Sequence, residues 1–154
     1  MMRLVADSNV LFTFFWKNSA LSGIMRQDFR LFSPEHSLAE IDKHRNGIIE
    51  KTGITENEFD SLLLLMKTKA EFVPRSAYEM HLADVEKLAG GFPDSEKASI
   101  MKDCDFLALA MLLGCPLWSN DKLLKKQPKV TVLSTQEVIA LFKPEKENAG
   151  PVAR

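Results

Sequence analysis

Three aspartates stand where the predicted elements of this sequence would bring them together. Asp7 directly follows the apolar run 4–6, and Asp121 comes shortly after the run Leu117-Trp118-Ser119; both runs are β-compatible. Asp103 opens a strongly apolar stretch immediately before the second of these runs. In an open parallel sheet, active sites lie outside the carboxyl ends of the strands. We therefore expect these carboxylates to share one edge of a sheet.

Carboxylates gathered in this way predict a specific chemistry. Two of them about 4 Å apart repel by roughly 4 kcal/mol at an effective dielectric constant of 20, so such a cluster needs a cation or protons. Oxygen ligands without histidine or cysteine favour a hard ion, Mg²⁺ or Mn²⁺. Such an ion lowers the pKa of a bound water and offsets charge on a phosphorane-like transition state. The predicted reaction is phosphodiester hydrolysis without a protein nucleophile.

Each acid also has a purely local interpretation. Aspartate is a favoured helix N-cap, and a negative charge there stabilises a helix by about 0.3–1 kcal/mol. A fourth acid, Glu40, ends the segment Ser37-Leu38-Ala39-Glu40, which has the form of a capping box. Local evidence favours that capping role for Glu40 over catalysis. Only the expected convergence of the acids favours a functional site.

Strands alternate with helices along the chain, which indicates a parallel sheet covered on both faces. The predicted strands are 4–6, 28–32, 71–73, 116–119 and 130–133. The predicted helices are 10–16 with Ser8 or Asn9 as the cap, 37–53, one that opens with a capping box at Thr55, 78–88, a buried helix 103–113, and 136–142. The segment 92–95 is predicted to be a loop that leads toward Asp103, and Trp16 and Trp118 are predicted to lie in the core.

Length and composition fit a single globular domain. The chain has 154 residues, of which 45% are hydrophobic, and its formal charge of −1 excludes a strongly basic nucleic-acid binder. We expect one domain over residues 1–142 and a disordered tail over 143–154. Cys104 and Cys115 are interpreted as reduced thiols, and no apolar run has the length of a signal core or a membrane span. These features predict a soluble, cytoplasmic protein with no membrane partner.

Basic residues follow two of the acids. Lys43, His44 and Arg45 come after Glu40, and Lys122, Lys125, Lys126 and Lys129 come after Asp121. These side chains are candidates to hold nucleic-acid phosphates on both sides of the acidic cluster. A solvated surface is an equally good interpretation of such lysines.

The sequence resembles the PIN-domain family along nearly all its length. Four segments carry the resemblance: Val5-Ala6-Asp7-Ser8-Asn9, Ser37-Leu38-Ala39-Glu40-Ile41, the run from Lys102 to Ala110, and Pro116-Leu117-Trp118-Ser119-Asn120-Asp121-Lys122. The resemblance implies a three-layer α/β/α fold with a five-stranded parallel sheet of order 3-2-1-4-5, and Mg²⁺- or Mn²⁺-dependent endoribonuclease activity. It also implies frequent homodimers. Many small relatives are toxins of the VapC kind, each neutralised by an antitoxin protein.

The resemblance also assigns site residues. By it, the metal-binding acids are Asp7, Glu40, Asp103 and Asp121, and Asn9 and Ser119 are polar residues that support the site. Asp105 lies near enough to Asp103 to be a second candidate for the same ligand position.

Other interpretations differ in what they require of these residues. A haloacid-dehalogenase-like phosphatase needs a second aspartate where this chain has Asn9. A phosphoacceptor receiver domain has no use for Asp103 and Glu40 together. A non-catalytic binding module of the same fold, and an RNA-processing nuclease outside a toxin–antitoxin pair, both remain open.

Overall fold

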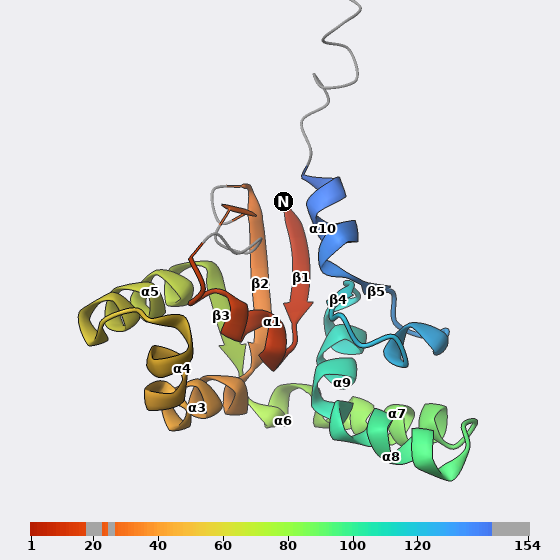
Figure 1. Ribbon diagram of the computed structural model, residues 1–154. Coiled ribbons are helices and arrows are strands. Elements are labelled where there is room, and N and C mark those ends of the chain that lie inside the picture. The colour runs from red at the N-terminus through yellow and green to blue at the C-terminus, as the bar shows by residue number, and fades with distance from the viewer. Residues whose placement is uncertain (18–22, 25–26, 143–154) are drawn as a thin grey trace, which may run out of the picture.

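The computed structural model describes residues 1–17, 23–24 and 27–142 and contains a central parallel sheet (Figure 1). The five strands lie in the order β3-β2-β1-β4-β5, which confirms the predicted topology. Their bounds are β1 Met2–Ala6, β2 Phe29–Pro34, β3 Ala70–Val73, β4 Leu117–Trp118 and β5 Val132–Leu133. The predicted disordered tail lies outside the described residues.

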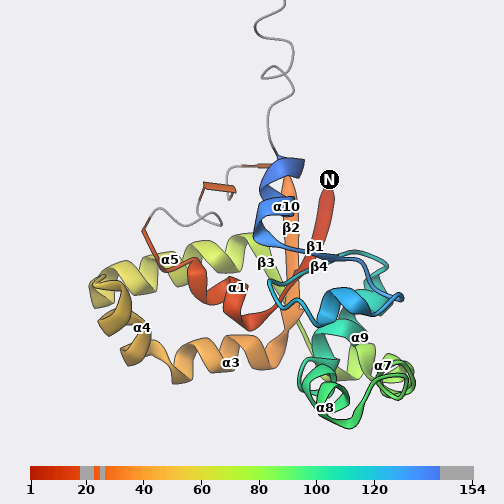
Figure 2. The same cartoon turned by 45° about the vertical axis from the view of Figure 1, so that its right-hand side comes forward.

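Helices cover both faces of the sheet, as Figures 1 and 2 show from two directions. One face is covered by α1 Ser8–Thr13, α3 Glu35–Lys43, α4 Arg45–Thr52, α5 Glu56–Lys69 and α10 Thr135–Leu141. The other face is covered by α6 Arg75–Tyr78, α7 Leu82–Ala89, α8 Asp94–Lys102 and α9 Cys104–Leu113. Two short 3-10 helices, η1 Glu79–His81 and η2 Leu124–Lys126, complete the described elements.

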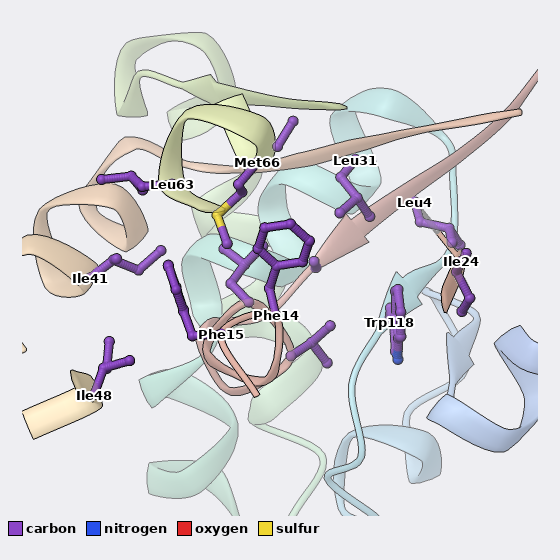
Figure 3. Packing of buried hydrophobic residues seen from close by; sticks show 14 of the residues in the cluster. Leu4, Phe14, Phe15, Ile24, Leu31, Ile41, Ile48, Leu63, Met66 and Trp118 are labelled. Carbon is purple, nitrogen blue, oxygen red and sulfur yellow. The ribbon is translucent and has the colours of Figure 1, made fainter. Parts of the chain in front are cut away.

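Side chains that alternate along the strands divide the core into two clusters. Leu4 and Ala6 of β1 pack into the cluster under α1 and α5, whereas Val5 packs into the cluster under α9. Figure 3 shows the first cluster, in which Phe14, the residue after α1, lies beside Met66 from α5. Both faces of the central strand are therefore buried, as expected for a parallel sheet between two helical layers.

The buried helix predicted after Asp103 is present as α9. All residues from Phe106 to Ala110 are buried, and the helix contacts β1, β2 and β4. It ends at Gly114, which has a φ of 63° in the left-handed region that glycine adopts most readily. Because α9 is packed on all sides, Asp103, its N-cap residue, is held in place by a rigid helix.

The segment after β2 differs from the sequence prediction. The helix begins at Glu35 rather than Ser37, and His44, with φ −98° and ψ 13°, separates α3 from α4. Ser37 is therefore inside α3 and buried, and its hydroxyl group forms a hydrogen bond with the Ser33 hydroxyl at 3.0 Å. The predicted capping box of Ser37 and Glu40 was wrong, because the helix begins at Glu35 and Ser37 is not its N-cap residue. The capping box at Thr55 was confirmed.

Three further predictions were wrong in whole or in part. Of the predicted loop 92–95, Phe92 and Pro93 do lie outside the helices, but Asp94 and Ser95 begin α8. The predicted helix 78–88 is divided among α6, η1 and α7. The Trp16 side chain is 46% exposed, whereas Trp118 is buried as predicted. Among the described residues, no helix has both the length and the apolar character needed to cross a bilayer.

Candidate active site

Asp7, at the end of β1, is held in place by a backbone amide of the helix that follows. Its Oδ1 atom accepts a hydrogen bond from the amide of Val10 at 2.9 Å, so Asp7 caps α1 in place of the predicted Ser8 or Asn9. The residue is only 8% exposed. Burial raises the pKa of Asp7, while hydrogen bonds from Ser119 and Val10 act to lower that pKa. The carboxyl group is thus fixed in orientation before any ligand binds.

Asp103 lies at the junction of α8 and α9 and is electrostatically coupled to the other acids. Partial burial is the main cause that raises the pKa of Asp103 to about 6. The negative charges of Asp7 and Asp121 raise this pKa further, and Lys102 acts to lower it. The three aspartates that the sequence placed at one sheet edge therefore lie close enough to interact through their charges.

Asp121 lies in the loop after β4 and is exposed. Its amide donates a hydrogen bond to Ser119 Oγ at 3.1 Å, and its Oδ1 atom accepts one from the amide of Leu123 at 2.9 Å. Ser119 is fully buried, and its side chain acts to lower the pKa of Asp7. One serine side chain thus links the loop that carries Asp121 to the carboxyl group at the end of β1.

Asn120 and Thr135 fix the same loop, and the sequence analysis assigned neither to the site. The Asn120 amide nitrogen donates to Thr135 Oγ1 at 2.9 Å, and Asn120 Oδ1 accepts from the Thr135 amide at 2.8 Å. The buried Trp118 indole also donates to Thr135 Oγ1, at 3.1 Å. No signal in the sequence pairs residues this far apart, because the contact depends on how α10 packs beside β4.

Glu40 and Asn9 are less tightly linked to the three aspartates. The Ser33 hydroxyl contacts the carbonyl oxygen of Ala6 at 2.9 Å as well as Ser37, which ties α3 to the end of β1. Glu40 lies one turn after Ser37 and is partly exposed. The described contacts do not join the Glu40 side chain to the aspartates. Asn9 is exposed, and its backbone amide acts to lower the pKa of Asp7.

Asp105 faces different surroundings from Asp103. Its Oδ2 atom accepts a hydrogen bond from the Tyr78 hydroxyl at 3.1 Å and lies 3.4 Å from His36 Nδ1. The charges that raise the pKa of Asp103 come from Asp7 and Asp121 and do not include Asp105. Two neighbouring acids thus contact separate sets of residues.

Comparison with known proteins identifies the family. A family model described as "PIN domain" matches residues 5–140, a range that includes all the candidate acids. This chain belongs to the PIN-domain family. PIN domains are generally nucleases, and those nucleases generally use divalent metal ions. The resemblance noted in the sequence is therefore confirmed.

A solved structure shares the fold of this PIN domain. It is the crystal structure of VapBC2 from Rickettsia felis bound to a DNA fragment from their promoter. The matching chain is 14% identical with a TM-score of 0.60, and the match covers 86% of this chain and 98% of that chain. No curated protein matches the sequence.

The oxygen donors of this PIN domain fit a hard divalent ion. Among the described residues, no three His, Cys, Asp or Glu side chains are already arranged as ligands of one ion. Asp7, Asp103 and Asp121 nevertheless form a mutually repelling group, and a cation would offset that repulsion. The oxygen donors of these three residues are thus suited to a hard divalent ion.

Several of the predicted nucleic-acid-binding residues already have acidic partners. Arg45 forms an ion pair with Asp60 and stacks over the Phe59 ring at 4.8 Å. Lys125 pairs with Glu137, and Lys126 pairs with Glu96 at 3.4 Å. Within the described part of the chain, Lys43 and Lys122 form no ion pair.

Proposed function

We propose that this PIN domain is an endoribonuclease that depends on Mg²⁺ or Mn²⁺. The observation that carries the proposal is the meeting of Asp7, Asp103 and Asp121 at the carboxyl ends of β1 and β4, where partial burial and then the charges of Asp7 and Asp121 raise the pKa of Asp103 to about 6. A carboxyl group with such a pKa sits in a site where added positive charge is favourable. A divalent ion meets that need and suits phosphodiester hydrolysis, because it supplies an activated water and offsets charge on the phosphate.

Each proposed residue has a defined role in this site. Asp7, Asp103 and Asp121 are proposed to bind the ion, with Glu40 approaching from α3 to complete the ligand set. Ser119 orients Asp7 and Asp121 through its hydroxyl group, and Asn9 supports Asp7. We place Asp105 outside the ligand set, because Tyr78 and His36 already occupy its carboxylate.

The RNA backbone is proposed to lie across the acids with lysines on either side. Lys43 and Lys122 are the strongest candidates for phosphate contacts, because the structure gives them no competing carboxylate among the described residues. Arg45, Lys125 and Lys126 would have to exchange an existing ion pair for a phosphate, so we expect smaller contributions from them. Affinity for RNA should fall as salt concentration rises.

We further propose that the protein is a cytoplasmic homodimer and the toxin of a toxin–antitoxin pair. The likeness to VapBC2 and the PIN-domain family support an antitoxin protein as the partner. Light scattering of the purified protein tests the dimer. Copurification with the product of a short reading frame immediately upstream of the gene tests the partner, and absence of such a frame would favour RNA processing instead.

A cleavage assay tests the nuclease proposal directly. Purified protein is incubated with labelled single-stranded RNA in Mn²⁺, in Mg²⁺ and in EDTA. We expect cleavage only with the ions, and a loss of about 100-fold or more in Asp7→Asn and Asp103→Asn. Asp28→Asn is the matched control, because Asp28 is an exposed aspartate just before β2, at the opposite end of the strands.

Two results would contradict the proposal. Cleavage that persists in EDTA would exclude a divalent ion as the cofactor. Metal-dependent cleavage that persists in both Asp7→Asn and Asp103→Asn would exclude the assigned site. RNA binding without any turnover, with or without metal, would instead favour a non-catalytic binding module of PIN fold.

A further inference from the structure

A cavity lined by ionisable side chains lies at the same end of the sheet as the three aspartates. It has a volume of about 420 Å³ and is lined by Glu35, His36, Arg75, Tyr78 and Asp105. These residues belong to the first turns of α3, α6 and α9, which meet at the lower end of the sheet in Figure 1. Because α3 and α6 directly follow β2 and β3, the cavity opens at the carboxyl ends of the strands, as the acids do.

The position of the cavity relative to the acids follows from the strand order. Asp7 and Asp121 follow β1 and β4, while the cavity lies over the ends of β2 and β3. Neighbouring strands are about 4.8 Å apart, so the two sites are separated by two strand spacings, or roughly 10 Å. A nucleotide next to the cleaved phosphodiester could therefore reach the cavity along the same sheet edge.

One wall of the cavity is held in a fixed arrangement. Asp105 accepts the hydrogen bond from the buried Tyr78 hydroxyl and lies 3.4 Å from His36 Nδ1. The His36 ring also packs edge-on against Phe106, with ring centroids 5.6 Å apart. These contacts orient the imidazole ring, and its Nε2 atom has no hydrogen bond among the described residues.

The opposite wall carries groups that are free to bind a ligand. Glu35 and Arg75 are exposed, and neither side chain has a hydrogen bond or ion pair within the described parts of the chain. Two carboxylates face one guanidinium and one imidazole in this cavity. Such a balance does not favour a phosphate group, but it suits a neutral planar molecule with both hydrogen-bond donors and acceptors.

We propose that this cavity is a base-recognition subsite that takes a guanine of the RNA strand next to the cleaved phosphodiester. The proposal rests on the nuclease function proposed above. The Arg75 guanidinium donates to guanine O6 and N7, a pairing that its fork geometry matches. Glu35 accepts from the guanine N1–H or amino group, and the fixed His36 ring stacks on the base, as aromatic rings do with unstacked RNA bases.

Guanine fits these groups better than the other bases do. Adenine presents a donor next to its N7 acceptor, an edge that an amide side chain matches and a guanidinium does not. Cytosine and uracil lack N7 and so cannot accept two hydrogen bonds from Arg75 in the same way. The subsite therefore predicts a sequence preference rather than general RNA affinity.

Paired oligonucleotides test the inference through a ratio of rates. Labelled oligouridines that contain a single guanosine or a single adenosine are cleaved in Mn²⁺, and kcat/KM is compared. We expect a preference of about 10-fold for the guanosine substrate. Arg75→Met and Glu35→Gln should bring the ratio close to one. Arg30→Met is the matched control. Arg30 in β2 pairs with Glu71 in β3, and neither residue lines the cavity, so this variant should retain the ratio.

A binding measurement separates failure of the inference from failure of the nuclease proposal. Cleavage with equal rates on both oligonucleotides would overturn the guanine subsite and leave the nuclease function standing. If no RNA is cleaved, fluorescence anisotropy of the same oligonucleotides decides the question. Tighter binding of the guanosine form, lost in Arg75→Met, would support the subsite, and equal binding would overturn it.

Discussion

The carboxyl groups of Asp7 and Asp103 are electrostatically coupled, so that the charge of Asp7 raises the pKa of Asp103. One belongs to the first strand and the other to the start of a buried helix late in the chain. Without an ion, this proximity is unfavourable for folding, because both groups are partly or fully removed from water. The proposed active site should therefore reduce the stability of the metal-free protein.

Replacing Asp103 by asparagine should stabilise the metal-free protein at pH 7. The pKa of Asp103 is about 6 in the folded state, whereas the ordinary value for an aspartate in an unfolded chain is 3.8. Between these values the folded protein binds more protons than the unfolded chain, so the free energy of unfolding falls as pH rises through this window. Because Asp103 is partly exposed, we expect a gain of about 1–2 kcal/mol in Asp103→Asn.

Urea unfolding in EDTA at pH 7 and pH 4 measures this effect. The difference between Asp103→Asn and the unmodified protein should be present at pH 7 and small at pH 4, where Asp103 is protonated in the folded state. Equal or lower stability of the variant at pH 7 would show that the acids do not strain the fold.

Manganese should raise the melting temperature of the protein. An ion that binds only the folded state at 100 times its Kd stabilises it by about 2.7 kcal/mol. The shift should shrink below pH 6, because protons compete with the ion for Asp103. Differential scanning calorimetry with and without Mn²⁺ measures it. Asp7→Asn and Asp103→Asn should lose the shift and Asp28→Asn should keep it; a full shift in the first two would place the ion elsewhere.

Replacing Asp105 by alanine should have the opposite effect on stability from Asp103→Asn. The change leaves the buried Tyr78 hydroxyl without its acceptor, which costs about 1–3 kcal/mol. Removing the hydroxyl as well, in the double variant with Tyr78→Phe, should recover much of this loss. Chemical denaturation of the two single variants and the double variant forms the test. If Asp105→Ala unfolds like the unmodified protein, the hydrogen bond does not stabilise the fold.

Changing Thr135 to valine should weaken the loop that carries Asp121. The buried Trp118 indole and the Asn120 amide both lose their acceptor, so we expect a loss of about 1–3 kcal/mol in the free energy of unfolding. Greater freedom of Asp121 should also lower kcat/KM for RNA by about 10- to 100-fold. Thr131→Val, at an exposed threonine before β5, is the control. Unchanged activity in Thr135→Val would mean that Asp121 is positioned without α10.

The sequence alone determined the elements whose signals come from near neighbours in the chain. The alternation of strands and helices predicted a parallel sheet, and the family resemblance supplied the order of its strands. The apolar stretch after Asp103 predicted a buried helix. Placing Asp7 after the first strand and Asp121 after the fourth followed from the same patterns. These features can be predicted from the sequence because the direction in which a side chain points along a helix or strand depends mainly on residues a few positions apart.

Only the tertiary structure decided which polar groups meet. It brought Asp103, and not Asp105, into electrostatic contact with Asp7, and it linked Asn120 to Thr135. It also gave Lys125 a carboxylate partner on α10. A hydrogen bond or a pKa depends on atoms a few ångströms away in space, and those atoms come from distant parts of the chain.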